Sequence, residues 1–190
     1  MMKKQKIFAL SIIVIMMALI VGGTSAYFTY TGRAKNVITM SGVAIELLED
    51  TAEVGVDGRP VPFANVNGAM PGDKISKIPK IKNVDEGEVY VRMKLTASVE
   101  YADGTSNRIS PETFRFDLSR NWMQRGGYYY YTQALKTGEI TDALFTTVTI
   151  PGSLADREQG AKYTLSVQGE AVQTANNGAT ALEAQGWPGE

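Results

Sequence analysis

Hydrophobic and polar residues alternate without interruption between Val89 and Glu100. One face of this stretch carries only apolar side chains, and the other face carries mostly polar ones. The apolar side chains are those of Val89, Val91, Met93, Leu95, Ala97 and Val99. A period of two residues predicts an antiparallel β-strand that buries one face. The stretch from Lys162 to Gln173 alternates in the same way and predicts a second strand.

Shorter β-prone stretches occupy much of the remaining chain. They lie at 36–48, 74–82, 114–118, 128–131 and 144–150. Turn signals such as Met70-Pro71-Gly72-Asp73 separate them. About eight short strands, with no long segment of helical period, indicate an all-β sandwich. We expect one sandwich domain over residues 27–178 and a C-terminal tail over 179–190, with one helical turn between Ala179 and Ala184.

The stretch from Lys74 to Lys82 predicts an edge strand of the sandwich. Its alternation is imperfect, its lysines recur, and Pro79 cannot donate a backbone hydrogen bond. A basic surface that contacts a membrane or an anionic polymer is the alternative interpretation of these lysines.

The first 26 residues have the pattern of a secretory signal peptide. Three lysines precede an apolar run from Ile7 to Val21, and small residues follow at Thr24 and Ala26. Such a run rises about 22 Å as a helix, whereas the hydrocarbon core of a bilayer is about 30 Å thick. We therefore expect a signal-peptide helix over 1–26 and cleavage between Ala26 and Tyr27. An uncleaved N-terminal anchor is the alternative.

Removal of this segment changes the length and charge of the protein. The first 26 of 190 residues carry three lysines and no acidic residue, so 164 residues remain, with 16 basic and 20 acidic side chains. This length is enough for one domain with a hydrophobic core. A net charge of about −4 favours solubility and offers no basic surface for nucleic acid.

The chain contains neither cysteine nor histidine. Disulfides and a lipid-anchored cysteine are therefore excluded, and so are Ser-His-Asp and Cys-His catalytic sets and histidine-containing zinc sites. We expect no enzymatic activity, no cofactor and no metal centre. Two acidic sets could still be considered for calcium, but neither has EF-hand spacing, and solvated turn residues are the simpler interpretation. The sets are Asp85, Glu86 and Glu88, and Asp103 with Asp117.

The aromatic residues have a structural and a functional interpretation. The run Tyr128 to Tyr131 could stack on a sugar, but in a strand two of its four rings would point into the core. We expect Trp122 and Trp187 to pack in the same way. The mature chain would begin with Tyr27-Phe28-Thr29-Tyr30, an apolar and β-prone terminus. Such a strand either completes its own sheet or pairs with another copy.

Several blocks of the sequence, in their order, resemble the TasA/camelysin family of exported Gram-positive proteins. The resemblance covers most of the chain. Its blocks are Gly22 to Thr29, Asn36 to Leu48, Pro71 to Lys74, Lys82-Asn83, Val89 to Arg92, Gly127 to Tyr131, Leu144-Phe145 and Glu170 to Gln173. The resemblance implies a two-sheet antiparallel jelly-roll sandwich and maturation by a dedicated ER-type signal peptidase. It also implies a structural role in biofilm-matrix fibres, secreted into the matrix or held at the cell surface.

Fibre-forming members of that family donate an N-terminal strand to the next subunit. The expected donor segment here is 27–39, and the expected partners are other copies of the chain, together with matrix proteins or polysaccharide. The residues that would take part are Tyr27, Phe28, Thr29, Tyr30, Val37 and Ile38. A monomeric surface module that binds polysaccharide or a host ligand is the alternative function. Casein-cleaving metalloprotease activity, described for some members, is a distant third because the zinc-binding HExxH motif is missing.

Overall fold

The computed structural model describes residues 28–35, 43–152 and 160–188, and for 28–35 it describes the backbone. The expected signal-peptide helix, the cleavage junction between Ala26 and Tyr27, and the expected donor residues Val37 and Ile38 lie outside these residues. Within the described ranges, no helix is long and apolar enough to cross a membrane.

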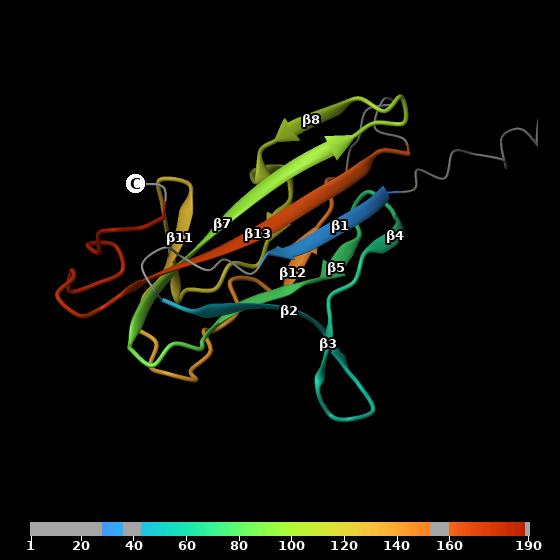
Figure 1. The fold of residues 1–190 in the computed structure, drawn as a ribbon. Coiled ribbons are helices and arrows are strands. Elements are labelled where there is room, and N and C mark those ends of the chain that lie inside the picture. Colours follow the sequence, from blue (N-terminus) through green and yellow to red (C-terminus); the bar gives the residue numbers. More distant parts are fainter. Residues whose placement is uncertain (1–27, 36–42, 153–159, 189–190) are drawn as a thin grey trace, which may run out of the picture.

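Apart from one short 3-10 helix, the regular secondary structure of the described chain consists of strands, so the predicted all-β class is confirmed (Figure 1). The strands are β1 (Phe28–Lys35), β2 (Ile45–Val54), β3 (Pro60–Pro62), β4 (Val66–Ala69), β5 (Lys74–Ser76), β6 (Ile78–Asn83), β7 (Val89–Glu100), β8 (Ser106–Ile109), β9 (Arg115–Phe116), β10 (Trp122–Arg125), β11 (Tyr128–Tyr131), β12 (Thr147–Thr149) and β13 (Lys162–Gln173). One short 3-10 helix, η1 (Pro111–Thr113), follows β8, and the Ser110 side chain caps it as its sequence predicts.

The larger sheet forms one layer of a jelly-roll-like sandwich. Its strands follow the order β10-β11-β7-β13-β1-β4, and β8 also pairs with β7. The two strands predicted from alternation, β7 and β13, have the predicted bounds and pair antiparallel along their whole length, from Val89 opposite Gln173 to Glu100 opposite Lys162. They form the centre of this layer (Figure 1).

The second layer contains the sheets β3-β2-β6 and β5-β12-β9. Strands β5 and β6 follow each other directly, separated by Lys77, and so connect the two sheets. Strands β5 and β6 each lie at the end of their sheet, so the predicted edge position of the stretch from Lys74 to Lys82 is confirmed. Non-strand residues between 138 and 146 form backbone hydrogen bonds along this stretch. The Lys77 backbone donates to the Thr146 carbonyl (3.1 Å), and the Pro79 carbonyl accepts from Leu144 (3.0 Å).

Acidic residues of β2 neutralise two of the lysines of this stretch. Lys77 lies 2.5 Å from Glu49, and Lys80 lies 2.9 Å from Asp50. The sequence alone could not reveal this pairing, since it depends on which strand lies alongside.

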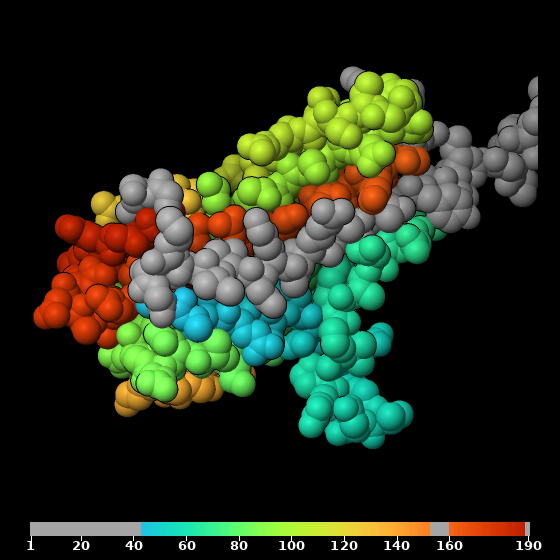
Figure 2. All heavy atoms as spheres, in the orientation of Figure 1, coloured from blue at the N-terminus to red at the C-terminus, as the bar shows by residue number. Residues whose placement is uncertain are grey.

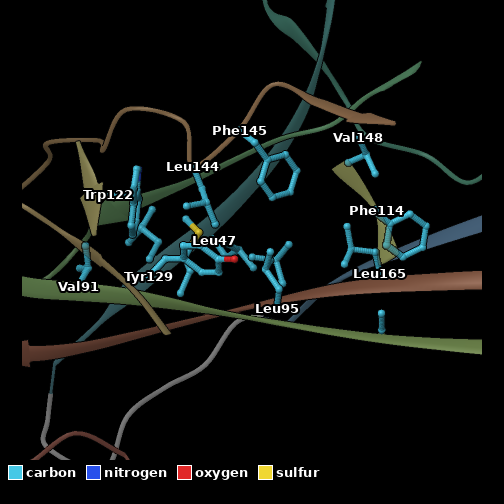
Figure 3. Close-up of a cluster of buried hydrophobic side chains, with 14 of the residues drawn as sticks. Leu47, Val91, Leu95, Phe114, Trp122, Tyr129, Leu144, Phe145, Val148 and Leu165 are labelled. Carbon is cyan, nitrogen blue, oxygen red and sulfur yellow. The ribbon is translucent and has the colours of Figure 1, made fainter. Parts of the chain in front are cut away.

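The hydrophobic core fills the space between the layers. The alternating apolar face of β7 is buried as predicted, with no side chain more than 6% exposed. Figure 3 shows Leu47, Leu144 and Phe145 of the second layer near Val91 and Leu95 of β7. The layers approach closely at Gly169, where a Cβ atom would lie 3.2 Å from the Ile81 side chain. Burial of this apolar surface is the main favourable contribution to folding.

The C-terminal segment covers the opposite face of the larger sheet. The Ala184 backbone donates to the Thr180 carbonyl (3.0 Å), which closes the predicted helical turn. Trp187 is buried and packs, with Ala181 and Ala184, in a cluster that contains Tyr90 and Val172 of the sheet. We refer to residues 177–188 as the C-terminal strap. The strap belongs to the packed structure of the sandwich and does not extend away from it (Figure 1).

Candidate functional site

The expected donor strand lies in the larger sheet of its own chain, between β13 and β4. Seven consecutive residues of β1 pair in parallel with β13, from Thr29 opposite Lys162 to Lys35 opposite Gln168. On its other side β1 pairs antiparallel with β4, with an irregularity in register between Phe28 and Tyr30. We call the space that β1 fills between β13 and β4 the strand slot.

Both borders of the strand slot are strand edges. Within the described residues, β4 pairs with no strand other than β1, so β1 alone links β4 to the larger sheet by strand pairing. Without β1, one edge of β13 and one edge of β4 would present unpaired N–H and C=O groups. Such edges readily accept another strand, because the backbone hydrogen bonds do not depend on which chain supplies it.

The parallel direction of β1 has a topological consequence. Parallel neighbours cannot be joined by a tight turn, and here residues 36–161, which form most of the domain, separate β1 from β13. Strand β1 is the first described strand, and the rest of the described domain follows it in the sequence.

The two faces of the sheet differ in polarity along β13, the strand that borders the slot. Tyr163, Leu165 and Val167 are buried in the core, whereas Thr164 and Ser166 are half-buried on the other face of the strand. The Tyr163 ring meets the Phe114 ring edge-on, at 5.9 Å between centroids. A strand that fills the slot therefore fits best when it has apolar residues on the core face and polar residues on the other face.

A buried ion pair connects β13 to β7 near the end of the slot. The Arg92 Nε atom donates to the Glu170 Oε2 atom at 2.7 Å, and both side chains are almost completely buried. The guanidinium group also lies over the rings of Tyr128 (3.8 Å) and Trp187 (4.5 Å) and donates to the Pro188 carbonyl (3.4 Å). The C-terminal strap thus shields this ion pair from water.

A second buried ion pair connects β2 to the junction of β5 and β6. Burial lowers the pKa of Lys77 from its ordinary value, although the charge of Glu49 and its hydrogen bond favour the protonated form. The Lys77 Nζ atom also lies 4.2 Å from the centre of the Phe63 ring. This pair is enclosed by the protein and fixes the register of the second layer.

The acidic residues considered for calcium have separate structural roles. The Asp103 carboxylate accepts from the Thr105 backbone in the turn after β7 (2.8 Å). The Asp117 carboxylate accepts from the backbones of Thr146 (2.9 Å) and Thr147 (2.7 Å). Burial alone would raise the pKa of Asp117, but these hydrogen bonds outweigh it and lower the pKa below its ordinary value. In the part of the chain that the structure describes, no group of three acidic side chains could hold a metal ion.

The tyrosine run is used for packing on both of its faces. Tyr129 and Tyr131 are buried, as the strand pattern predicts. Tyr128 and Tyr130 flank Arg92, and the Tyr130 ring meets the Trp187 ring edge-on at 5.6 Å. Little open ring surface is left for stacking on a sugar. Trp122 is buried too, and its indole N–H donates to the Asp142 carbonyl (3.1 Å).

The structure brings three of the predicted site residues together and reveals elements that the sequence did not indicate. Phe28, Thr29 and Tyr30 lie in β1, inside the strand slot, whereas Tyr27 lies outside the described residues. The role of β4 as one border of the slot and the cover provided by the strap were both missed. Their positions depend on pairing between residues far apart in the sequence, for which a single sequence carries no signal.

Comparison of the chain with protein-family models, with curated proteins and with solved structures finds no match.

Proposed function

We propose that this protein is an exported structural subunit that forms or joins extracellular fibres by exchanging its N-terminal strand between copies. In this proposal the described fold is the closed state, in which β1 fills the strand slot of its own chain. In a fibre, β1 of one copy fills the slot of the next. The same hydrogen bonds form in both states, so the exchange has no cost in backbone pairing.

The position of β1 is the observation that supports this proposal. It is the first described strand, and its two neighbours, β13 and β4, both depend on it for pairing at the slot. In the proposed mature protein, which would begin at Tyr27, β1 is the N-terminal strand. A head-to-tail exchange that does not close on itself produces a filament. The resemblance to the TasA/camelysin family favours the same role, a matrix or cell-surface fibre protein.

A disulfide that locks β1 in its own chain tests the proposal. Thr31 and Thr164 are opposite each other in the β1–β13 pair, and the chain has no cysteine of its own. We expect the T31C/T164C variant of the mature protein to form no fibres after oxidation and to form fibres after reduction, because only the reduced strand can leave. Electron microscopy and light scattering under both conditions provide the measurement.

A matched disulfide controls for the effect of cross-linking itself. Thr96 and Ser166 pair between β7 and β13, two strands that the exchange leaves in place. The oxidised T96C/S166C variant should therefore form fibres like the unmodified protein. Fibres from the oxidised T31C/T164C monomer would contradict the proposal. A wild-type protein that stays monodisperse at high concentration and binds a glycan would favour the surface-module alternative.

A further inference from the structure

The β2–β3 hairpin projects from the sandwich as a two-stranded ribbon (Figures 1 and 2). Strand β2 pairs with β6 from Ile45 to Asp50, and beyond Asp50 its only strand partner within the described residues is β3. The turn at the tip is well defined. The Gly55 backbone donates to the Arg59 carbonyl (2.8 Å), and Gly58 has a φ of 75°, which favours glycine.

The tip of this hairpin exposes apolar side chains. Val56 is fully exposed and Val54 is 68% exposed, and they are the two most exposed large hydrophobic residues in the described chain. Met70, at the end of β4, is 56% exposed. A tip with adjacent exposed valines on an ordered turn is a feature of contact surfaces.

A groove of about 540 Å³ lies at the base of the same hairpin. Apolar side chains of β2–β3, β4 and β5 line it, and charged groups lie among them. The apolar set is Val61, Phe63, Val66 and Ile75, and the charged set is Glu53, Asp73 and Lys74. The groove therefore offers apolar side chains against which the exposed valines of a hairpin tip could pack.

We propose that the hairpin tip of one copy binds in the groove of a second copy, and that the second hairpin binds back in the first groove. Because tip and groove belong to one ribbon, a two-fold axis between antiparallel hairpins allows both contacts to form at once. Val54 and Val56 would enter the groove beside Phe63 and Ile75. The contact is independent of strand exchange and does not rest on the proposed fibre function.

Tip and groove each carry both signs of charge: Asp57 and Arg59 lie at the tip, and Lys74, Glu53 and Asp73 line the groove. Asp57 lies at the tip, with its side chain 61% exposed, and its ion pair with Arg59 is long, at 3.9 Å. Lys74 is an exposed residue of the groove. In the two-fold arrangement the Asp57 carboxylate would approach the Lys74 ammonium group of the other copy. Complementary charges of this kind fix the register of an interface.

The test uses the oxidised T31C/T164C protein, in which β1 cannot exchange, so that any association must come from another surface. Sedimentation equilibrium over a concentration series should show a monomer–dimer equilibrium. The V54S/V56S variant should weaken dimerisation roughly tenfold or more, as loss of central apolar contacts usually does. The matched control is Val84→Ser, which alters an exposed valine in the turn between β6 and β7.

Exchange of the charges of Asp57 and Lys74 distinguishes the proposed contact from non-specific association. Asp57→Lys alone and Lys74→Asp alone should each weaken the dimer, and the double variant should recover much of the lost affinity. A locked protein that is monomeric at every concentration would overturn the proposal, as would equal effects of V54S/V56S and V84S or a double variant weaker than both single ones. None of these outcomes bears on the fibre experiment, which is read from the presence or absence of fibres in the oxidised and reduced protein.

Discussion

Replacement of Glu170 by glutamine is expected to destabilise the protein by about 3–5 kcal/mol, the range for breaking a buried ion pair on one side. The Arg92 guanidinium is completely buried, and Glu170 is its only carboxylate partner among the described residues. The substitution keeps the size of the side chain but removes the negative charge that Arg92 contacts on Glu170. Urea unfolding at neutral pH, analysed with a common m-value, measures the change.

The double variant R92M/E170L tests whether the unpaired charge is the cause. Removing both partners abolishes the buried charge, so we expect it to recover a large part of the stability that E170Q loses. Recovery would be incomplete, because Arg92 also packs against the rings of Tyr128 and Trp187. If E170Q unfolds at the same urea concentration as the unmodified protein, this account of the ion pair is wrong.

Replacement of Lys77 by methionine is expected to have a comparable effect, again about 3–5 kcal/mol, because Glu49 would remain buried without its partner. Lys80→Met, three residues further along in β6, is the matched control. Lys80 and Asp50 are partly exposed, so their pair should contribute no more than about 1 kcal/mol. Equal losses in the two variants would contradict the distinction between an enclosed and a partly exposed pair.

The pH dependence of stability gives an independent check on Lys77. Its pKa is lowered in the folded state, mainly by burial, so the unfolded state binds more protons between that lowered pKa and the ordinary value of 10.5. Stability attributable to this residue should therefore rise with pH across that interval. Burial raises the pKa of Tyr129 and Tyr131 above 10.0, so their contribution falls at higher pH. Below pH 10, the K77M/E49Q variant should lack the rise that the unmodified protein shows.

Much of the fold could be predicted from the sequence because the central strands depend on a local pattern. The period-two alternation from Val89 to Glu100 and from Lys162 to Gln173 identified β7 and β13 with their observed bounds. Alternation shows which face of a strand is apolar, and in the structure the apolar face of β7 is buried in the core. It carries no information on which element covers the other face. The burial of Tyr90 and Arg92 under the strap was therefore not predictable from β7 itself.

The candidate site was predictable only in part, for a related reason. The apolar, β-prone composition of Phe28 to Tyr30 indicated a strand, and β1 is a strand. Its neighbours could not be inferred, because β13 lies at the far end of the sequence and β4 is a short stretch, Val66–Ala69, with a glycine inside it. The lysines from Lys74 to Lys82 correctly indicated the end of a sheet. Their pairing with Glu49 and Asp50 could not be inferred, because it depends on which strand lies alongside.

The distance in sequence between β1 and β13 also determines when these two strands can pair during synthesis or export. A chain that is made or translocated N-terminus first releases β1 long before its partner, since residues 36–161 come between them. At usual synthesis rates this interval is roughly ten seconds. Throughout it β4 is the only strand of its own chain with which β1 pairs that has already been made. Finished copies nearby therefore compete with the still incomplete C-terminal part of the same chain. The local concentration of the protein where the chain emerges would then determine how often β1 of a new chain pairs with its own β13 and how often it pairs with another copy.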